Sequence, residues 1–192
     1  MARTDVREKL LTAGLEALHK RGFNGTGVQD ITDAAKVPKG SFYNHFESKD
    51  ALGVEVVERY AANGAGRREP LMEGSGLPLT RLRTYFKALN QLGPPTGFSR
   101  GCLLGNFGTE LSAQSPAIRA ALEAAFDDWT KAIAQVIAEA QKAGDVSRDI
   151  PAETLANFLL NAWEGAVMRS KVEKDPAALD AFLSVTFNKI LI

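Results

Sequence analysis

Residues 37–46 of the chain read VPKGSFYNHF, and this stretch decides the fold class. Phe42 and Phe46 stand four residues apart, so they share one face of a short helix. The other positions offer hydrogen-bond donors: Lys39, Ser41, Tyr43, Asn44 and His45. A second apolar stripe at helical spacing precedes them, formed by Val28, Ile31, Ala34 and Ala35. Two short helices and a tight connection predict a helix-turn-helix whose second helix enters the DNA major groove.

The flanking sequence predicts how these two helices begin. Residues 4–21 form an expected first helix with an apolar repeat close to 3.6 residues, and Gly22 ends it. Thr26 and Gln29 have the spacing of a capping box, so we expect Thr26 to cap the second helix while Gln29 reaches back to it.

The rest of the chain is predicted to be helical as well, which gives an all-α fold of about nine helices. Ser48 is an expected cap for the fourth helix, and Ser115 followed by proline opens the seventh. We expect a three-helix helix-turn-helix domain at residues 1–48 and a larger effector-binding and dimerisation domain at residues 49–192.

Composition sets limits on the class of protein. The 192 residues are 45% apolar and 24% charged, as in soluble globular proteins. No apolar run reaches the roughly 18 residues of a membrane span, and the N-terminus lacks the apolar core of a secretory signal, so we expect a cytoplasmic protein. The net charge is +0, but residues 36–49 carry three lysines against Glu47, a local charge of +2. That modest phosphate-binding patch implies a dimer that shares the electrostatic attraction to DNA.

A longer pattern surrounds the helix-turn-helix. It comprises Arg21-Gly22-Phe23, Thr26, Val28, Ile31, Ala35, Lys39-Gly40-Ser41-Phe42-Tyr43, Phe46, Ser48-Lys49 and Leu52. In order and spacing these residues resemble the N-terminal domain of the TetR family of transcriptional repressors over residues 4–52. The resemblance implies an all-helical DNA-binding homodimer that responds to a small molecule.

Three positions depart from the family pattern. The family usually has a hydroxyl residue in place of Gly27, glycine in place of Lys36, and serine or threonine in place of Pro38. We expect Lys36 to close the turn in a left-handed conformation, at a cost in free energy. The sequence of residues 38–43, PKGSFY, resembles that of the NemR-like subgroup of the family.

Donor groups around the second short helix are the expected DNA contacts. Tyr43 and Lys49 suit phosphate, Lys39 suits phosphate or a guanine edge, and Ser41 and Asn44 suit bases. The family pattern adds His45 and Thr26 as phosphate contacts. The full expected set is Thr26, Gln29, Lys39, Gly40, Ser41, Tyr43, Asn44, His45 and Lys49.

The last two long helices are apolar around much of their circumference. A monomer of this size has too little interior to bury all of that apolar surface. The resemblance implies that they pair with a second copy as a four-helix bundle. The expected interface comprises Phe158, Leu159, Ala162, Ala166, Leu179, Phe182 and Leu183. The alternative is that these are ordinary core helices. A dimer would place two recognition helices on a palindromic operator.

Aromatic residues of the larger domain are expected to line an effector pocket, beside glycines that leave room. The expected residues are Tyr85, Phe86, Phe98, Cys102, Phe107, Phe126, Trp129 and Trp163. Aromatic residues at helical spacing are also common in plain cores. Asn106, Thr109 and Glu110 are polar candidates for orienting a ligand.

Cys102 is the single cysteine, so no disulfide forms within one chain. Its setting, Gly101-Cys102-Leu103, resembles the NemR-like regulators, in which this cysteine senses electrophiles or oxidants. The start of a helix favours thiolate, and Lys171 is a candidate partner for that thiolate. The alternative is an inert, buried small residue.

Nothing in the sequence favours an enzyme. The glycines near Cys102 match neither a dinucleotide loop nor a P-loop, no Cys/His cluster has metal-ligand spacing, and a Cys/His pair would need His19 or His45 from the DNA-binding domain. We expect no cofactor and no metal. The predicted function is a DNA-binding transcriptional regulator, a repressor that releases its operator on binding an effector or on modification of Cys102. One alternative is a helical small-molecule binding protein that no longer binds DNA, and another is an enzyme that uses Cys102 to turn over an electrophile.

Overall fold

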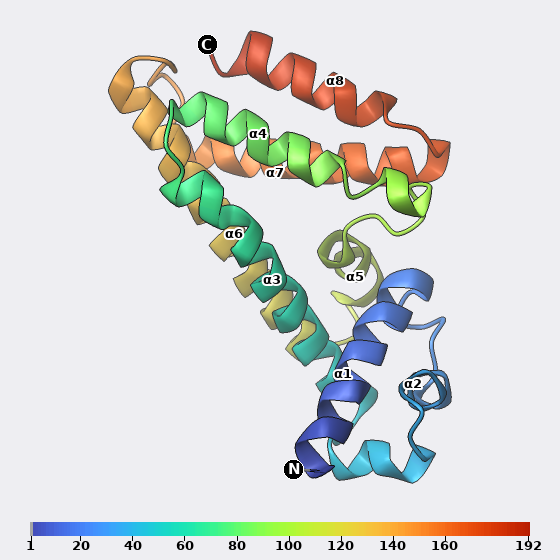
Figure 1. Cartoon of the computed structure of the whole chain (residues 1–192). Coiled ribbons are helices and arrows are strands. Elements are labelled where there is room, and N and C mark those ends of the chain that lie inside the picture. Colours follow the sequence, from blue (N-terminus) through green and yellow to red (C-terminus); the bar gives the residue numbers. More distant parts are fainter. Residues whose placement is uncertain (1) are drawn as a thin grey trace. The chain divides into compact units, whose positions relative to one another are not determined.

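The computed structural model describes residues 2–192, with side chains from Val6 onward. The described residues form helices and no strand (Figure 1), so the all-α prediction is confirmed. In chain order the elements are α1 (Ala2–Arg21), α2 (Val28–Ala35), the 3₁₀-helix η1 (Lys39–Asn44), α3 (Lys49–Glu73), α4 (Pro78–Asn90), the short 3₁₀-helix η2 (Pro94–Thr96), α5 (Leu103–Leu111), α6 (Pro116–Ala143), α7 (Ala152–Glu173), α8 (Ala177–Val185) and a π-helical turn η3 (Thr186–Ile190).

The chain forms two compact units. Unit 1 comprises the described residues up to Ala62 together with Leu103–Ala125, and unit 2 comprises Asn63–Cys102 and Phe126–Ile192. Helices α3 and α6 each contribute residues to both units. Helix α5 therefore packs with the N-terminal helices, although the sequence assigns it to the larger domain. The functional boundary after residue 48 stays a prediction.

The core of unit 1 lies beneath η1. Phe42 and Phe46 are almost completely buried, and their ring centroids are 5.6 Å apart, so the predicted shared apolar face is confirmed. Ile31 of α2 and Leu52 of α3 are fully buried in the same unit. Burying these large side chains is what holds the short segments α2 and η1 in place, because isolated helices of this length are unstable in water.

The turn between α2 and η1 has the predicted geometry. Lys36 has φ +56° and ψ +45°, in the left-handed region, and its N–H donates to Asp33 O at 3.1 Å. Pro38 then precedes η1 with φ −59° and ψ 142°. The side chain of Lys36 is exposed, so its backbone conformation, and not its packing, is what distinguishes this position.

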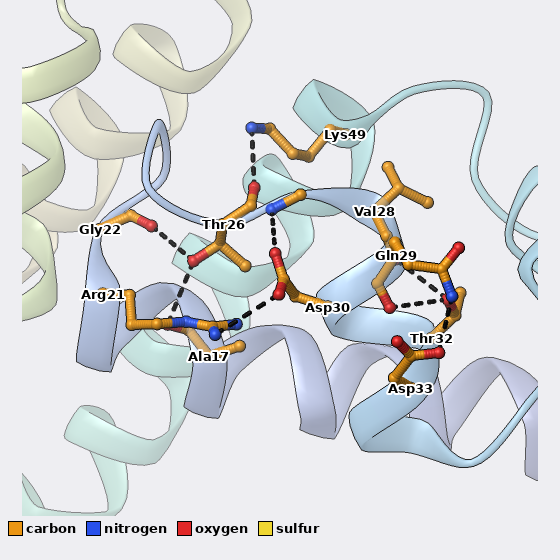
Figure 2. Close-up of polar contacts among 11 residues, drawn as sticks. Ala17, Arg21, Gly22, Thr26, Val28, Gln29, Asp30, Thr32, Asp33 and Lys49 are labelled. Atoms are coloured by element: carbon orange, nitrogen blue, oxygen red, sulfur yellow. Dashed lines mark hydrogen bonds and ion pairs between the residues drawn. The ribbon is translucent and has the colours of Figure 1, made fainter.

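The start of α2 differs from the prediction (Figure 2). Gly27 is the N-cap residue, and its N–H donates to the Asp30 carboxylate at 2.7 Å. The hydroxyl of Thr26 is instead turned back toward α1, where it donates to Gly22 O at 2.8 Å. Gln29 donates to Asp33 at 2.7 Å. The predicted Thr26–Gln29 capping box is therefore wrong, because the helix begins one residue later and the end of α1 offers Thr26 a nearer acceptor.

Unit 2 is built from long helices that pack along one another. Helix α8 runs back alongside α7 after the turn at residues 174–176, and it also contacts α4 (Figure 1). One buried polar bridge joins these helices: Trp163 Nε1 donates to Asn90 Oδ1 at 2.9 Å, and Asn90 Nδ2 donates to Leu179 O at 3.4 Å. Asn90 thus fixes the register of three helices.

The left-handed turn residue gives the first testable prediction. Replacing Lys36 by glycine should raise the free energy of unfolding by about 1 kcal/mol relative to Lys36→Ala, since alanine keeps the Cβ that disfavours this conformation and glycine does not. Urea unfolding of the two variants measures the difference. Equal stability of the two variants would contradict the proposed backbone strain.

Candidate functional site

Helix η1 presents the predicted DNA-contacting side chains to solvent. Tyr43 is 60% exposed, Lys39 and Asn44 are also exposed, and Ser41 and His45 are half-buried. The Tyr43 ring stands edge-on to the buried Phe42, with 5.2 Å between centroids. Because Phe42 anchors this helix in the core, the donor-bearing face is held outward on a fixed support.

Lys49 lies at the start of α3 and holds the connection between α1 and α2. Its Nζ donates to Phe23 O and to Thr26 O, each at 3.0 Å, and lies 4.2 Å from the centroid of the Phe23 ring. Figure 2 shows this side chain reaching the backbone at Thr26. An ammonium has three N–H groups, so one beyond these two bonds is left for a phosphate oxygen.

The other two candidates before η1 differ in exposure. Thr26 is 1% exposed and its hydroxyl is engaged inside unit 1, whereas Gln29 lies on the exposed side of α2. A buried hydroxyl is poorly placed to reach a phosphate through its side chain. The DNA-contacting role of both residues stays a prediction.

Glu110, on α5, binds the same connection with a negative charge, whereas Lys49 binds it with a positive one. Its carboxylate accepts from Phe23 N at 3.0 Å and from Asn24 N at 2.6 Å. Gly22 has φ +80°, and a Cβ there would lie 3.1 Å from the Glu110 Oε2. The sequence singled out Glu110 as a ligand-orienting group, and its structural role was missed because its partners lie 86 and 87 residues away.

The predicted effector residues of unit 2 form a buried aromatic cluster. Tyr85, Phe86, Trp129 and Trp163 are all buried. The Trp129 and Trp163 ring centroids are 5.4 Å apart, and those of Tyr85 and Phe86 are 5.6 Å apart. Phe98 and Phe126, in the same unit, are half-buried.

Phe107 is the one predicted aromatic residue that belongs to unit 1. It is fully buried there, and its ring packs edge-on against Phe23, with 5.8 Å between centroids. Its contribution to an effector pocket stays a prediction.

Cys102 immediately precedes α5 and is 3% exposed. Its thiol hydrogen-bonds the carboxyl group of Glu164 on α7, a residue that the sequence did not single out. Burial raises the pKa of Glu164 to about 7, and the hydrogen bond from Cys102 opposes that shift. A carboxyl with this pKa is largely protonated in mildly acidic solution. The predicted pairing of Cys102 with Lys171 stays a prediction.

An apolar groove runs along α7 and α8. Its volume is about 550 Å³, and its walls include Phe158, Ala162, Ala166, Phe182, Val185 and Ile190. Phe158 is 52% exposed. Of the predicted dimer residues, Leu159 and Leu179 are buried in the core of unit 2, and Leu183 is half-buried. The groove is therefore a large unpartnered apolar surface at the predicted dimer face.

The part of the chain that the structure describes has neither a membrane-spanning helix nor a cluster of metal ligands. No helix within residues 2–192 is long and apolar enough to cross a membrane. No group of three or more histidine, cysteine, aspartate or glutamate side chains there is arranged to hold a metal ion.

Comparison with known families agrees with this geometry. A family profile described as "Bacterial regulatory proteins, tetR family" matches residues 10–56, and one described as "Tetracyclin repressor-like, C-terminal domain" matches residues 78–186, more than half of the chain. The chain belongs to the TetR family.

Relatives match along almost the whole chain. The HTH-type transcriptional repressor DhaR of Mycobacterium sp. (strain GP1) is 42% identical over all of this chain and 95% of that protein. The repressor NemR of Escherichia coli (strain K12) is 31% identical over 97% of this chain and 94% of that protein, in agreement with the predicted NemR-like character. The crystal structure of regulatory protein TetR from Rhodobacter sphaeroides is 38% identical, with a TM-score of 0.89, over 96% of this chain and 98% of that one.

Membership of the family settles the class of function. Its members are DNA-binding transcriptional regulators rather than enzymes, and they are typically dimers. The predicted helix-turn-helix regulator is thereby confirmed.

The Cys102–Glu164 pair gives a pH prediction. Because the folded-state pKa of Glu164, about 7, lies above the ordinary glutamate value of 4.5, the stability from its neutral form is complete below pH 4.5 and is lost as pH rises through 7. The unfolding free energy of the wild type should therefore fall between pH 5 and 8 relative to Glu164→Gln, by on the order of 3 kcal/mol at most. Urea unfolding at both pH values checks this. Replacing the exposed Glu153 of the same helix by glutamine is the control, and parallel pH curves for wild type and Glu164→Gln would refute the assignment.

Proposed function

We propose that the chain is a homodimeric repressor that binds a palindromic operator and releases it when unit 2 takes up an effector. The observation that carries this proposal is the exposed donor face of η1, supported from below by the buried Phe42. A buried anchor beneath an outward polar face is what a recognition helix needs in order to place side chains against base edges with little loss of conformational freedom.

In this proposal some side chains of η1 bind DNA phosphates and others contact the bases. Tyr43 and Lys39, both exposed, bind phosphate oxygens, together with the remaining donor of Lys49. Ser41 and Asn44 face the bases, and Asn44 suits the N6/N7 edge of adenine. His45 and Gly40 lie at the flanks, where the imidazole and a backbone N–H are available to phosphate.

The groove along α7 and α8 supports the proposed dimer. An apolar groove next to exposed Phe158 and Val185 is costly to leave in water, and burial against the same surface of a second copy removes that cost. A two-fold interface presents the same patch from both protomers, and it would set two η1 helices at a fixed spacing for two half-sites.

Two routes to release remain, and both begin in unit 2. In one, a small molecule binds reversibly among the buried aromatic residues. In the other, an electrophile or oxidant modifies Cys102, which is buried and would need to become accessible. In either case the effector must favour the state that fits DNA poorly. Helix α3, which continues from unit 1 into unit 2, is the proposed transmitting element.

DNA binding is tested by mobility shift on the DNA upstream of the chain's own reading frame, at several salt concentrations. Lys39→Ala should weaken the complex and lower the slope of log affinity against log salt by roughly 1 for each protomer, because each lysine releases about one counterion. The exposed Lys142, in unit 2, is the matched control, and Lys142→Ala should leave the slope unchanged. An unchanged slope for Lys39→Ala would remove Lys39 from the interface.

Dimerisation is tested by placing a charge in the groove. Phe158→Glu should yield a monomer at micromolar concentration in sedimentation and lower operator affinity at least tenfold, since each half-site is then bound alone. Leu92, which is 50% exposed and is not among the residues lining the groove, supplies the control Leu92→Glu, expected to stay dimeric. A dimeric Phe158→Glu protein would show that α7 and α8 do not form the interface.

A further inference from the structure

Unit 2 buries side-chain polar atoms that have no hydrogen-bond partner. Among the described residues these atoms are Arg81 Nε, Ser170 Oγ, Trp129 Nε1 and Glu164 Oε1. Arg81 uses its other nitrogens for an ion pair with Glu139 and for carbonyl oxygens of α3. An indole N–H and a carboxyl oxygen left unpaired in a buried site are costly, and such groups often mark where a ligand or water completes the bonding.

Trp129 and Glu164 belong to one cluster. The Glu164 carboxyl hydrogen-bonds the Cys102 thiol, and Cys102 lies within electrostatic range of the Tyr85 phenol. The indole of Trp129 faces the Tyr85 hydroxyl, although its N–H reaches no partner in good hydrogen-bond geometry. A donor and an acceptor without partners therefore belong to one buried cluster that also contains Cys102 and Tyr85.

The second tryptophan of the pair, Trp163, differs from Trp129 because its indole N–H has a hydrogen-bond partner. Trp163 packs against Trp129 at 5.4 Å between centroids, yet its own N–H is bonded to Asn90 at 2.9 Å. The fold thus satisfies one indole of the pair and leaves the other, which is 6% exposed, unpaired beside Tyr85.

Charge in the cluster favours an uncharged ligand. Burial and the Cys102 thiol are what shift the pKa of Glu164, and no basic side chain contributes to that shift. Of the two arginines that act on Tyr85, Arg68 is already paired with Asp128 and Arg67 is exposed to solvent. An anion would meet an uncompensated carboxyl group, and a cation without an acceptor atom would leave the Trp129 N–H unpaired.

We propose that Trp129, Glu164 and Tyr85 form the polar end of the effector site and select a small uncharged molecule, such as an alcohol or primary amide, that carries a donor beside an acceptor. The ligand oxygen accepts from Trp129 Nε1, its O–H or N–H donates to Glu164 Oε1, and its apolar part packs on the aromatic rings. This inference rests on the proposed effector site in unit 2. Binding is reversible and forms no bond to Cys102.

The test uses the full-length chain and its own fluorescence, because Trp129 and Trp163 are its two tryptophans. Four probes share a four-carbon skeleton: 1-butanol, butanamide, butyrate and butylammonium. We expect saturable fluorescence changes with the alcohol and the amide, at concentrations at least fivefold lower than any response to the two ions. No saturable response to the neutral probes, or tighter binding of an ion, would overturn the proposal.

Matched variants locate the site. Trp129→Phe removes the unpaired N–H and leaves Trp163 as the reporter, and Glu164→Leu removes the acceptor at similar volume; each should weaken butanamide binding at least fivefold. Glu153→Gln, at an exposed position of the same helix, should stay within twofold of the wild type. Unchanged affinity in both Trp129→Phe and Glu164→Leu would refute the assignment. Operator binding of the wild type without probe is measured separately, so that failure of the regulator function is distinguished from failure of this ligand class.

Discussion

The connection between α1 and α2 is the constraint on which the DNA-facing part of the molecule depends. Its backbone offers N–H groups at Phe23 and Asn24 and carbonyl oxygens at Phe23 and Thr26. The Glu110 carboxylate takes the first pair and the Lys49 ammonium takes the second. Two opposite charges thus replace the helical hydrogen bonds that the chain loses where α1 ends. Since α2 starts directly after this connection and η1 packs on α2, the position of the recognition helix follows from it.

The two units treat buried polar groups differently. In unit 1 the buried hydroxyls of Thr26, Thr32 and Ser115 are all hydrogen-bonded. Every unpaired buried side-chain atom found among the described residues belongs to unit 2. A fully bonded interior suits a unit that must hold side chains rigidly against DNA. An incompletely bonded interior suits a unit whose most stable form includes a second molecule.

What the sequence predicts well is local. The apolar period predicted the helices, and the caps at Ser48 and Ser115 follow from the residues next to them. The left-handed Lys36 was predictable because the turn needs that conformation whatever residue occupies it. The roles of Glu110 and Glu164 were missed, since their partners lie more than 50 residues away in the chain. Thr26 was misassigned because the sequence shows a hydroxyl at capping distance but does not show the nearer acceptor at the end of α1.

Helix α5 joins Cys102 to the α1–α2 connection along the chain. Cys102 directly precedes its first residue, and Glu110 lies near its last turn. The Glu110 bond to Asn24, at 2.6 Å, tolerates a displacement of only about 0.5 Å before it weakens. A shift of α5 by that amount would therefore loosen the hold of Glu110 on the α1–α2 connection.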